Sequence, residues 1–123
     1  MKVMRNMSKA ELKKFLDGEE IVGKDQRYNK STVDFGVCFF PYDNEDCRIQ
    51  VETWFWEIVA LFEIDEELLT KGVGRYPDWN YLFDLSKHKM LPEYSIPAYS
   101  KKNAKFLGYH HKHCPAEILW EVI

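Results

Sequence analysis

Few residues of this sequence could do chemistry, and the first is an arginine within an apolar run. Arg5 lies in the segment Lys2 to Met7, where strand alternation places Val3, Arg5 and Met7 on one face. A guanidinium between apolar neighbours needs an anionic partner, because an unpaired buried charge is costly. The sequence predicts that this partner is either a carboxylate of the same chain or a phosphate of a bound molecule.

Two further polar sites follow in chain order. Ser31 and Thr32 stand at the start of a second strand, and Glu93 opens a later strand in LPEYSIPAYS. Arg5, Ser31-Thr32 and Glu93 thus form a constellation that is ordered along the chain but is weaker than a motif. From this order we expect Arg5 and Glu93 to line a common cleft. Each residue also has an ordinary alternative, in which Arg5 pairs with a glutamate, Ser31 caps a turn and Glu93 is an exposed strand end.

Metal and thiol chemistry are weakly signalled. The run His110 to Cys114 (HHKHC) is the densest group of metal-ligating residues, but it lacks the spacing of a zinc site, so we predict no metal. The three cysteines are Cys38, Cys47 and Cys114, and none forms a CxxC pair. An odd number of such cysteines is typical of reduced thiols in an intracellular, cytoplasmic protein.

The elements that must position these residues can be outlined from the pattern. Ser8 to Glu11 fits a capping box that starts a helix, and Gly18 ends that helix. The segment Glu19 to Lys30 is polar and is predicted to be a loop. A strand over Thr32 to Phe40 follows, and its apolar face holds Val33, Phe35, Val37 and Phe39.

The second half of the chain predicts one helix and several strands. The pattern predicts a helix around Cys47 to Trp54, then a strand ending at Ile64 and a new helix start at Asp65. The segment Gly72 to Trp79 is predicted to be loop. Three strand-like runs complete the chain: Glu93 to Ile96, Ala104 to His110 and Ile118 to Ile123. The pattern predicts an α+β fold for residues 1–123 as a single domain, with a central, mostly antiparallel mixed sheet and a few short helices.

Composition narrows the class of partner. The chain has 123 residues, is 46% hydrophobic and 15% aromatic, and carries a net charge of −3. This balance supplies no basic field for nucleic acid. The longest uncharged stretch, Phe35 to Tyr42, is too short to span a bilayer, and the N-terminus lacks the apolar region of a signal peptide. Neither a nucleic acid nor a membrane is therefore expected as a partner.

The order of these sites carries a resemblance. An arginine on the first strand, a serine-threonine pair on the next and a glutamate on a later strand are similar to the Arg-Ser-Glu class of the ADP-ribosyltransferase-like fold. The runs MRNMSKAEL, STVDFGVCFF and PEYSIPAYS also look like small uncharacterised proteins of bacteriophages and mobile elements.

The resemblance implies roles for the residues. Arg5 would hold the phosphates of NAD, Ser31 and Thr32 would shape the nicotinamide pocket, and Glu93 would bind ribose and support an oxocarbenium-like transition state. Such a protein would transfer ADP-ribose from NAD to a macromolecule. Two alternatives remain: a catalytically inactive binding protein that inhibits a host protein such as a defence nuclease, and a structural or regulatory interaction module in which Arg5 pairs with an internal carboxylate.

Overall fold

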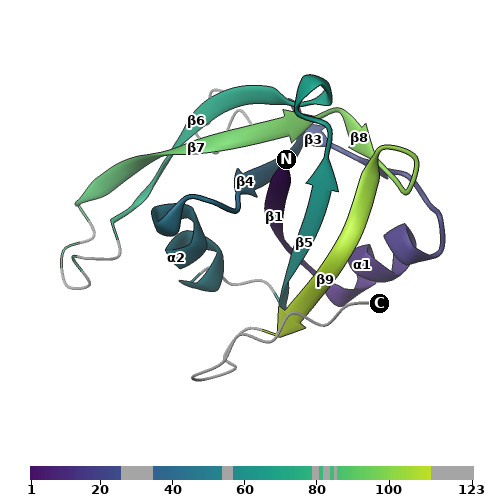
Figure 1. Cartoon of the computed structure of the whole chain (residues 1–123). Helices are drawn as coiled ribbons and strands as arrows, with labels where there is room; N and C mark the ends of the chain where they lie inside the picture. Colours follow the sequence, from purple (N-terminus) through teal and green to yellow (C-terminus); the bar gives the residue numbers. More distant parts are fainter. Residues whose placement is uncertain (26–34, 54–56, 79–80, 82–83, 85, 112–123) are drawn as a thin grey trace.

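The computed structural model describes residues 1–25, 35–53, 57–78, 81, 84 and 86–111 (Figure 1). One sheet forms its frame, with the strand order β6-β7-β4-β1-β5-β9, and all these neighbours are antiparallel. These six strands are β1 (Lys2–Met7), β4 (Phe35–Pro41), β5 (Ile58–Ile64), β6 (Thr70–Pro77), β7 (His88–Ile96) and β9 (Ala104–His111). The predicted α+β class with a central antiparallel sheet is confirmed.

Three short strands complete the pairing. β3 (Lys24–Asp25) pairs with β4, while β2 (Ile21–Val22) pairs with β8 (Ala98–Tyr99) in a separate two-stranded sheet. Gly23 lies where the chain passes β4, and a Cβ atom at Gly23 would be only 2.2 Å from the carbonyl carbon of Gly36. The segment Glu19 to Lys30, predicted to be loop, therefore contains two short strands, which their partners and this close backbone approach hold in place.

Two helices pack on opposite faces of the sheet. Val3 of β1 lies in one buried cluster with Phe15 of α1 (Lys9–Leu16), whereas Met4 lies in a second cluster with Val51 of α2 (Glu45–Thr53). Alternation along a strand produces this division, because neighbouring side chains point to opposite faces. In the part of the chain that the structure describes, no helix is long and apolar enough to cross a membrane.

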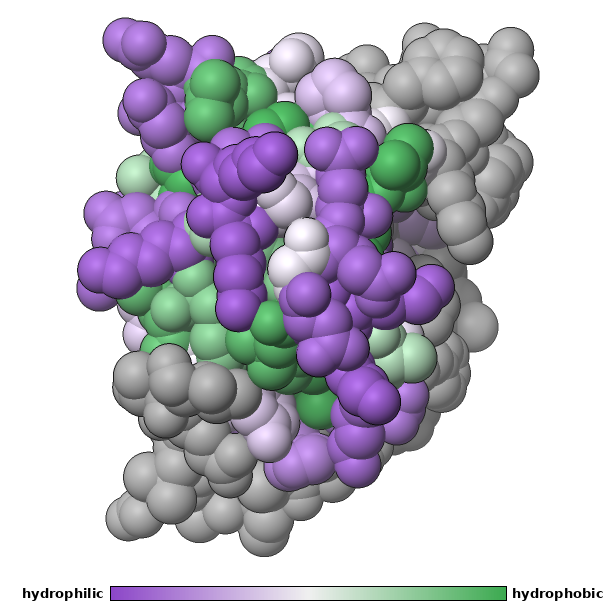
Figure 2. Space-filling model, turned by 90° about the vertical axis from the view of Figure 1, so that its right-hand side faces the viewer, coloured by the Kyte–Doolittle hydropathy of each residue, from purple (hydrophilic) through white to green (hydrophobic). Residues whose placement is uncertain are grey.

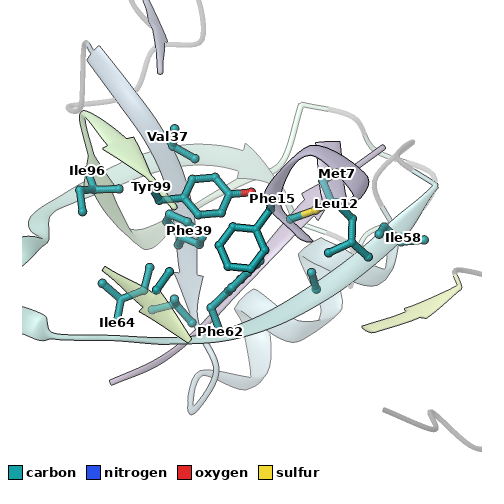
Figure 3. Packing of buried hydrophobic residues seen from close by; sticks show 13 residues of the cluster. Met7, Leu12, Phe15, Val37, Phe39, Ile58, Phe62, Ile64, Ile96 and Tyr99 are labelled. Carbon is teal, nitrogen blue, oxygen red and sulfur yellow. The ribbon is translucent and has the colours of Figure 1, made fainter. Parts of the chain in front are cut away.

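The face covered by α1, which we call the α1 face, has an aromatic core (Figure 3). Phe15 and Phe62 meet edge to face with ring centroids 5.1 Å apart, and Phe39 meets Tyr99 in the same way at 5.3 Å. Val37 and Phe39 both belong to this cluster, which confirms the predicted core face of their strand. Val33 and the side chain of Phe35 lie outside what the structure describes.

Helix α1 begins and ends where its sequence predicts. The Ser8 hydroxyl oxygen accepts the backbone N–H of Glu11 at 3.1 Å, as an N-cap should. The helix ends at Leu16, and Gly18 follows with φ +88°, a conformation that glycine adopts without steric cost.

In the second half of the chain, the structure differs from the predictions at β6 and at the start of β7, which begins at His88 and not at Glu93. The break between α2 and β5 is confirmed, and the helix start at Asp65 is a single 3₁₀ turn, η2 (Glu66–Leu68). The segment Gly72 to Trp79 was predicted to be loop, but β6 continues to Pro77 and pairs along its whole length with β7. Gly74, one of the glycines that suggested a loop, lies instead against the side chain of Glu93 in β7. The predicted strand from Ile118 to Ile123 falls outside the described residues.

Candidate functional site

The anionic partner of Arg5 is Glu11. The guanidinium donates from Nε to Glu11 Oε2 at 2.7 Å and from Nη2 to Oε1 at 2.9 Å, while Nη1 donates to the backbone carbonyl of Cys38 at 3.1 Å. Burial disfavours the charge of Arg5, but the hydrogen bonds and the negative charge of Glu11 outweigh it, and the pKa of Arg5 is raised. All three guanidinium nitrogens therefore donate hydrogen bonds within the protein. Of the two partners expected for Arg5, a carboxylate of the same chain or a bound phosphate, the structure shows the carboxylate.

A buried tyrosine extends this ion pair. The Tyr99 hydroxyl donates to Glu11 Oε2 at 2.8 Å, and burial, with the Glu11 charge second, raises the pKa of Tyr99. The Arg5 guanidinium also lies 5.9 Å from the ring centroid of Phe39. The local sequence explains the arrangement, because the chain turns at Ser8 from β1 into α1 and so brings the first helical turn back over Arg5.

Glu93 lies in a different environment. Glu93 is 1% exposed, and its Oε1 accepts a hydrogen bond from the Tyr76 hydroxyl. A Cβ atom at Gly74 would lie 1.7 Å from Glu93 Oε1, so the glycine provides the space that the carboxyl group fills. Glu93 is a buried member of β7 and not an exposed strand end.

The groups around Glu93 are held in their neutral forms. Burial, and then the charge of Glu93, raises the pKa of Cys38 to about 11, and burial raises the pKa of Cys47 to about 12. The pKa of Tyr76 is raised for the same two reasons, burial first. Thiols with such pKa values are poor nucleophiles at neutral pH. Cys38 and Cys47 are both free thiols, and Cys114 lies outside the described residues.

The structure places Arg5 and Glu93 on opposite faces of the sheet. Phe39 pairs with Tyr94 across β4 and β7, so Tyr94 shares the α1 face and its neighbour Glu93 points to the other. Leu91, two residues before Glu93, belongs to the cluster under α2. The expectation that Arg5 and Glu93 line a common cleft is wrong. Both residues lie on strands, as predicted, but the alternation of side chains along those strands directs them to opposite faces of the sheet. Ser31 and Thr32 fall outside the described residues.

The histidine run divides at the end of β9. The Nε2 atom of His110 lies 2.6 Å from Glu52 Oε1 of α2, and His110 is buried at that contact. His111 packs its ring edge to face with Tyr109, at 5.6 Å between centroids. Within the described ranges, no group of three or more ligating side chains could hold a metal ion, and His113 and Cys114 lie beyond them.

The sequence analysis missed an open groove between η2 and the turn from β8 to β9. The groove has a volume of about 600 Å³. Figure 2 shows the molecule from the side where α1 and β9 lie in Figure 1, with apolar surface between hydrophilic side chains. The residues that line the groove are of three kinds. They are apolar (Phe15, Leu68, Ala104 and Phe106), charged (Glu63, Asp65, Lys101, Lys102 and Lys105) and, at Asn103, an amide. The only advance signal is the lysine-rich run KKNAKF that follows Ser100.

Comparison with known proteins adds no family to these observations. The chain matches no protein-family model, no curated protein and no solved structure. The function must therefore be argued from the geometry of the chain itself.

Proposed function

We propose that this chain is a binding protein without transferase chemistry, and that it acts by occupying a protein partner. One observation carries the proposal: the guanidinium of Arg5, the group that would have to grip the phosphates of NAD, donates from all three of its nitrogens inside the protein. The bidentate fork, the feature for which arginine suits phosphate, is occupied by Glu11.

Releasing Arg5 for a ligand would be costly. Glu11 would keep its negative charge in a partly buried position with the Tyr99 hydroxyl as a remaining donor. Breaking a buried ion pair typically costs about 3–5 kcal/mol, and this pair, with side chains 22% and 19% exposed, stands somewhat below that range. A phosphate would have to supply this free energy before it gained any affinity.

The carboxyl group adds a second support. For Glu93 to act on a sugar held by Arg5, its side chain would have to reach the other face of the sheet, although it is 1% exposed and fills the space over Gly74. Because Arg5 and Glu93 both find their partners inside the protein, they suit a scaffold in which these polar residues stabilise the fold and the surface binds a partner protein. A net charge of −3 disfavours nucleic acid as the partner. The partner that we propose is an intracellular protein of a host cell, as the resemblance to phage and mobile-element proteins implies.

Calorimetric titration of NAD into the purified chain tests this proposal, together with transfer of labelled ADP-ribose to a bacterial lysate. We expect neither heat of binding nor labelling. Arg5→Met and Glu93→Gln variants, run beside the wild type, give the control for any signal. NAD binding that Arg5→Met abolishes, or labelling that Glu93→Gln reduces on the order of 10²–10³-fold, would overturn the proposal in favour of the transferase.

A further inference from the structure

We propose that the groove between η2 and the β8–β9 turn binds an acidic peptide segment of a partner protein, with one large apolar side chain as its anchor. The inference rests on the proposed binding function and adds the site and the chemistry of the partner. It is drawn from the lining of the groove, the state of its lysines and the rigidity of the turn that carries two of them.

The apolar part of the groove suits an anchor residue. Phe15 is fully buried at the base, Phe106 is partly buried beside it, and the two rings lie 6.3 Å apart between centroids. Leu68 on η2 is 48% exposed. An aromatic or long aliphatic side chain of a partner would cover Leu68 and the exposed part of Phe106, and such anchors supply most of the affinity of peptide grooves.

The lysines of the groove have no charged partner in the part of the chain that the structure describes. Lys101, Lys102 and Lys105 form no ion pair there, in contrast to Lys89, which pairs with Asp46 at 3.0 Å. Glu63 pairs in register with Lys105 across β5 and β9, so their charges offset each other in part. Lys101 and Lys102 are left as the pair of cations at the rim.

The turn that carries these two lysines is held in one conformation. The Ser100 N–H donates to Asn103 Oδ1 at 2.9 Å, the Lys102 N–H donates to Ser100 Oγ at 3.2 Å, and the Asn103 amide donates to the carbonyl of Ala98 at 3.2 Å. The lysine side chains are exposed and take no part in these bonds. A partner carboxylate therefore meets cations on a preorganised turn, and ordering the turn costs little affinity.

The charge distribution favours an acidic peptide over other anions. The chain as a whole is acidic, and Glu63 and Asp65 also line the groove. A membrane or a nucleic acid presents many negative charges over a wide area and would meet this acidic surface, whereas a short peptide can place its carboxylates at Lys101 and Lys102 alone.

The test is a titration of the full chain, labelled with nitrogen-15, with a capped peptide of the sequence Glu-Glu-Trp-Glu-Glu. Binding is measured from the changes in the amide chemical shifts of the chain. We expect a dissociation constant on the order of 1 mM or tighter, with the largest shifts at residues 63–68 and 101–106. The double variant Lys101→Glu/Lys102→Glu should weaken binding about tenfold, which corresponds to two lost surface ion pairs. Replacing the tryptophan of the peptide by alanine should weaken it by a similar factor.

The matched control is Arg75→Glu/Lys87→Glu, toward the turn between β6 and β7, which makes the same change in net charge. It should leave peptide binding within about twofold of the wild type. Absence of shifts in the groove up to about 5 mM peptide overturns the proposal, as does equal binding of Lys-Lys-Trp-Lys-Lys. Preferential binding of phosphatidylserine vesicles or of an oligonucleotide, or a dimer that the Lys101→Glu/Lys102→Glu variant dissociates, also overturns it. None of these outcomes bears on NAD, so a failed groove and a failed binding function are distinguishable.

Discussion

The two faces of the central sheet each bury an ionisable residue that the sequence singles out, and they satisfy it in opposite ways. On the α1 face, Arg5 meets the full opposite charge of Glu11. On the other face, which we call the α2 face, the carboxyl group of Glu93 accepts a hydrogen bond from the neutral hydroxyl of Tyr76. The difference teaches that the spacing of an arginine and a glutamate along the chain does not by itself define a site, because each can be satisfied separately.

The faces also differ in what surrounds these groups. The α1 face packs four aromatic rings within 6 Å of one another in pairs, from Phe15, Phe39, Phe62 and Tyr99. The buried cluster of the α2 face is made of aliphatic residues and sulfur-containing side chains, and two polar residues, Gln50 and His110, are buried nearby on α2 and β9. We therefore expect the α1 face to carry more of the free energy of unfolding.

The sharpest test of that expectation compares two neighbours on β4. Phe39→Ala removes a fully buried ring from the α1 face and should lower the free energy of unfolding by about 3–5 kcal/mol. Phe40→Ala removes a half-buried ring from the α2 face, where it meets Tyr76 at 5.3 Å, and should cost roughly 1–2 kcal/mol. Urea denaturation of both variants measures the difference. An equal loss of unfolding free energy in the two variants, or a larger loss for Phe40→Ala, would show that the α1 face does not carry the larger share of the stability.

Much of the fold could be predicted because its signals are local. The cap at Ser8, the stop at Gly18 and the alternation through Val37 and Phe39 depend on residues within a few positions of each other. The succession of a short helix and then a strand, α2 and β5, was also predicted. A helix start at Asp65 requires the preceding element to end near Ile64, which favoured a strand there over one continuous helix.

What could not be predicted depends on contacts between distant segments. The glycine pattern around Gly74 is typical of a loop, and only the position of Glu93 across the strand pair explains why a strand needs a residue without a side chain there. In the same way, Glu11 is a standard third residue of a capping box, and nothing within that motif shows that its carboxylate turns to Arg5. The expectation of a cleft shared by Arg5 and Glu93 was wrong for this reason, since a long-range interpretation was given to Arg5, a residue with a local partner.

The ion pair gives the second test, because a charge paired with a charge should respond strongly to the loss of one member. Glu11→Leu leaves Arg5 charged and partly buried, and should cost about 1–3 kcal/mol of the free energy of unfolding. Arg5→Met/Glu11→Leu removes both charges and should recover most of that loss, since an apolar pair of similar volume often replaces a buried ion pair without cost. Denaturation of the single and double variants completes the cycle. A double variant as unstable as Glu11→Leu would show that the pair is not the source of the stability.

The third test removes one neutral donor from the α2 face. Tyr76→Phe deletes the hydroxyl that donates to Glu93 and leaves a carboxyl group that is 1% exposed with one donor fewer. A buried acceptor that loses one hydrogen-bond donor typically costs about 1–3 kcal/mol of the free energy of unfolding. Thermal unfolding at neutral pH measures it, and a melting temperature equal to that of the wild type would contradict the role given to this hydroxyl.

The smallest effect should come from the matching change on the α1 face. Tyr99→Phe deletes the hydroxyl that donates to Glu11 Oε2 at 2.8 Å, but Arg5 still donates to both oxygens of that carboxylate. The ring of Tyr99 stays in place, stacked on Phe15 at 5.4 Å, so packing changes little. The acceptor keeps a charged partner, and the loss should be that of one ordinary hydrogen bond, about 0.5–1.5 kcal/mol. Measured beside Tyr76→Phe under the same conditions, Tyr99→Phe should therefore be the milder of two chemically identical substitutions. If it is the more damaging, the hydroxyl of Tyr99 rather than the guanidinium of Arg5 holds Glu11 in position, and the contrast between a face that uses charge and a face that uses neutral donors fails.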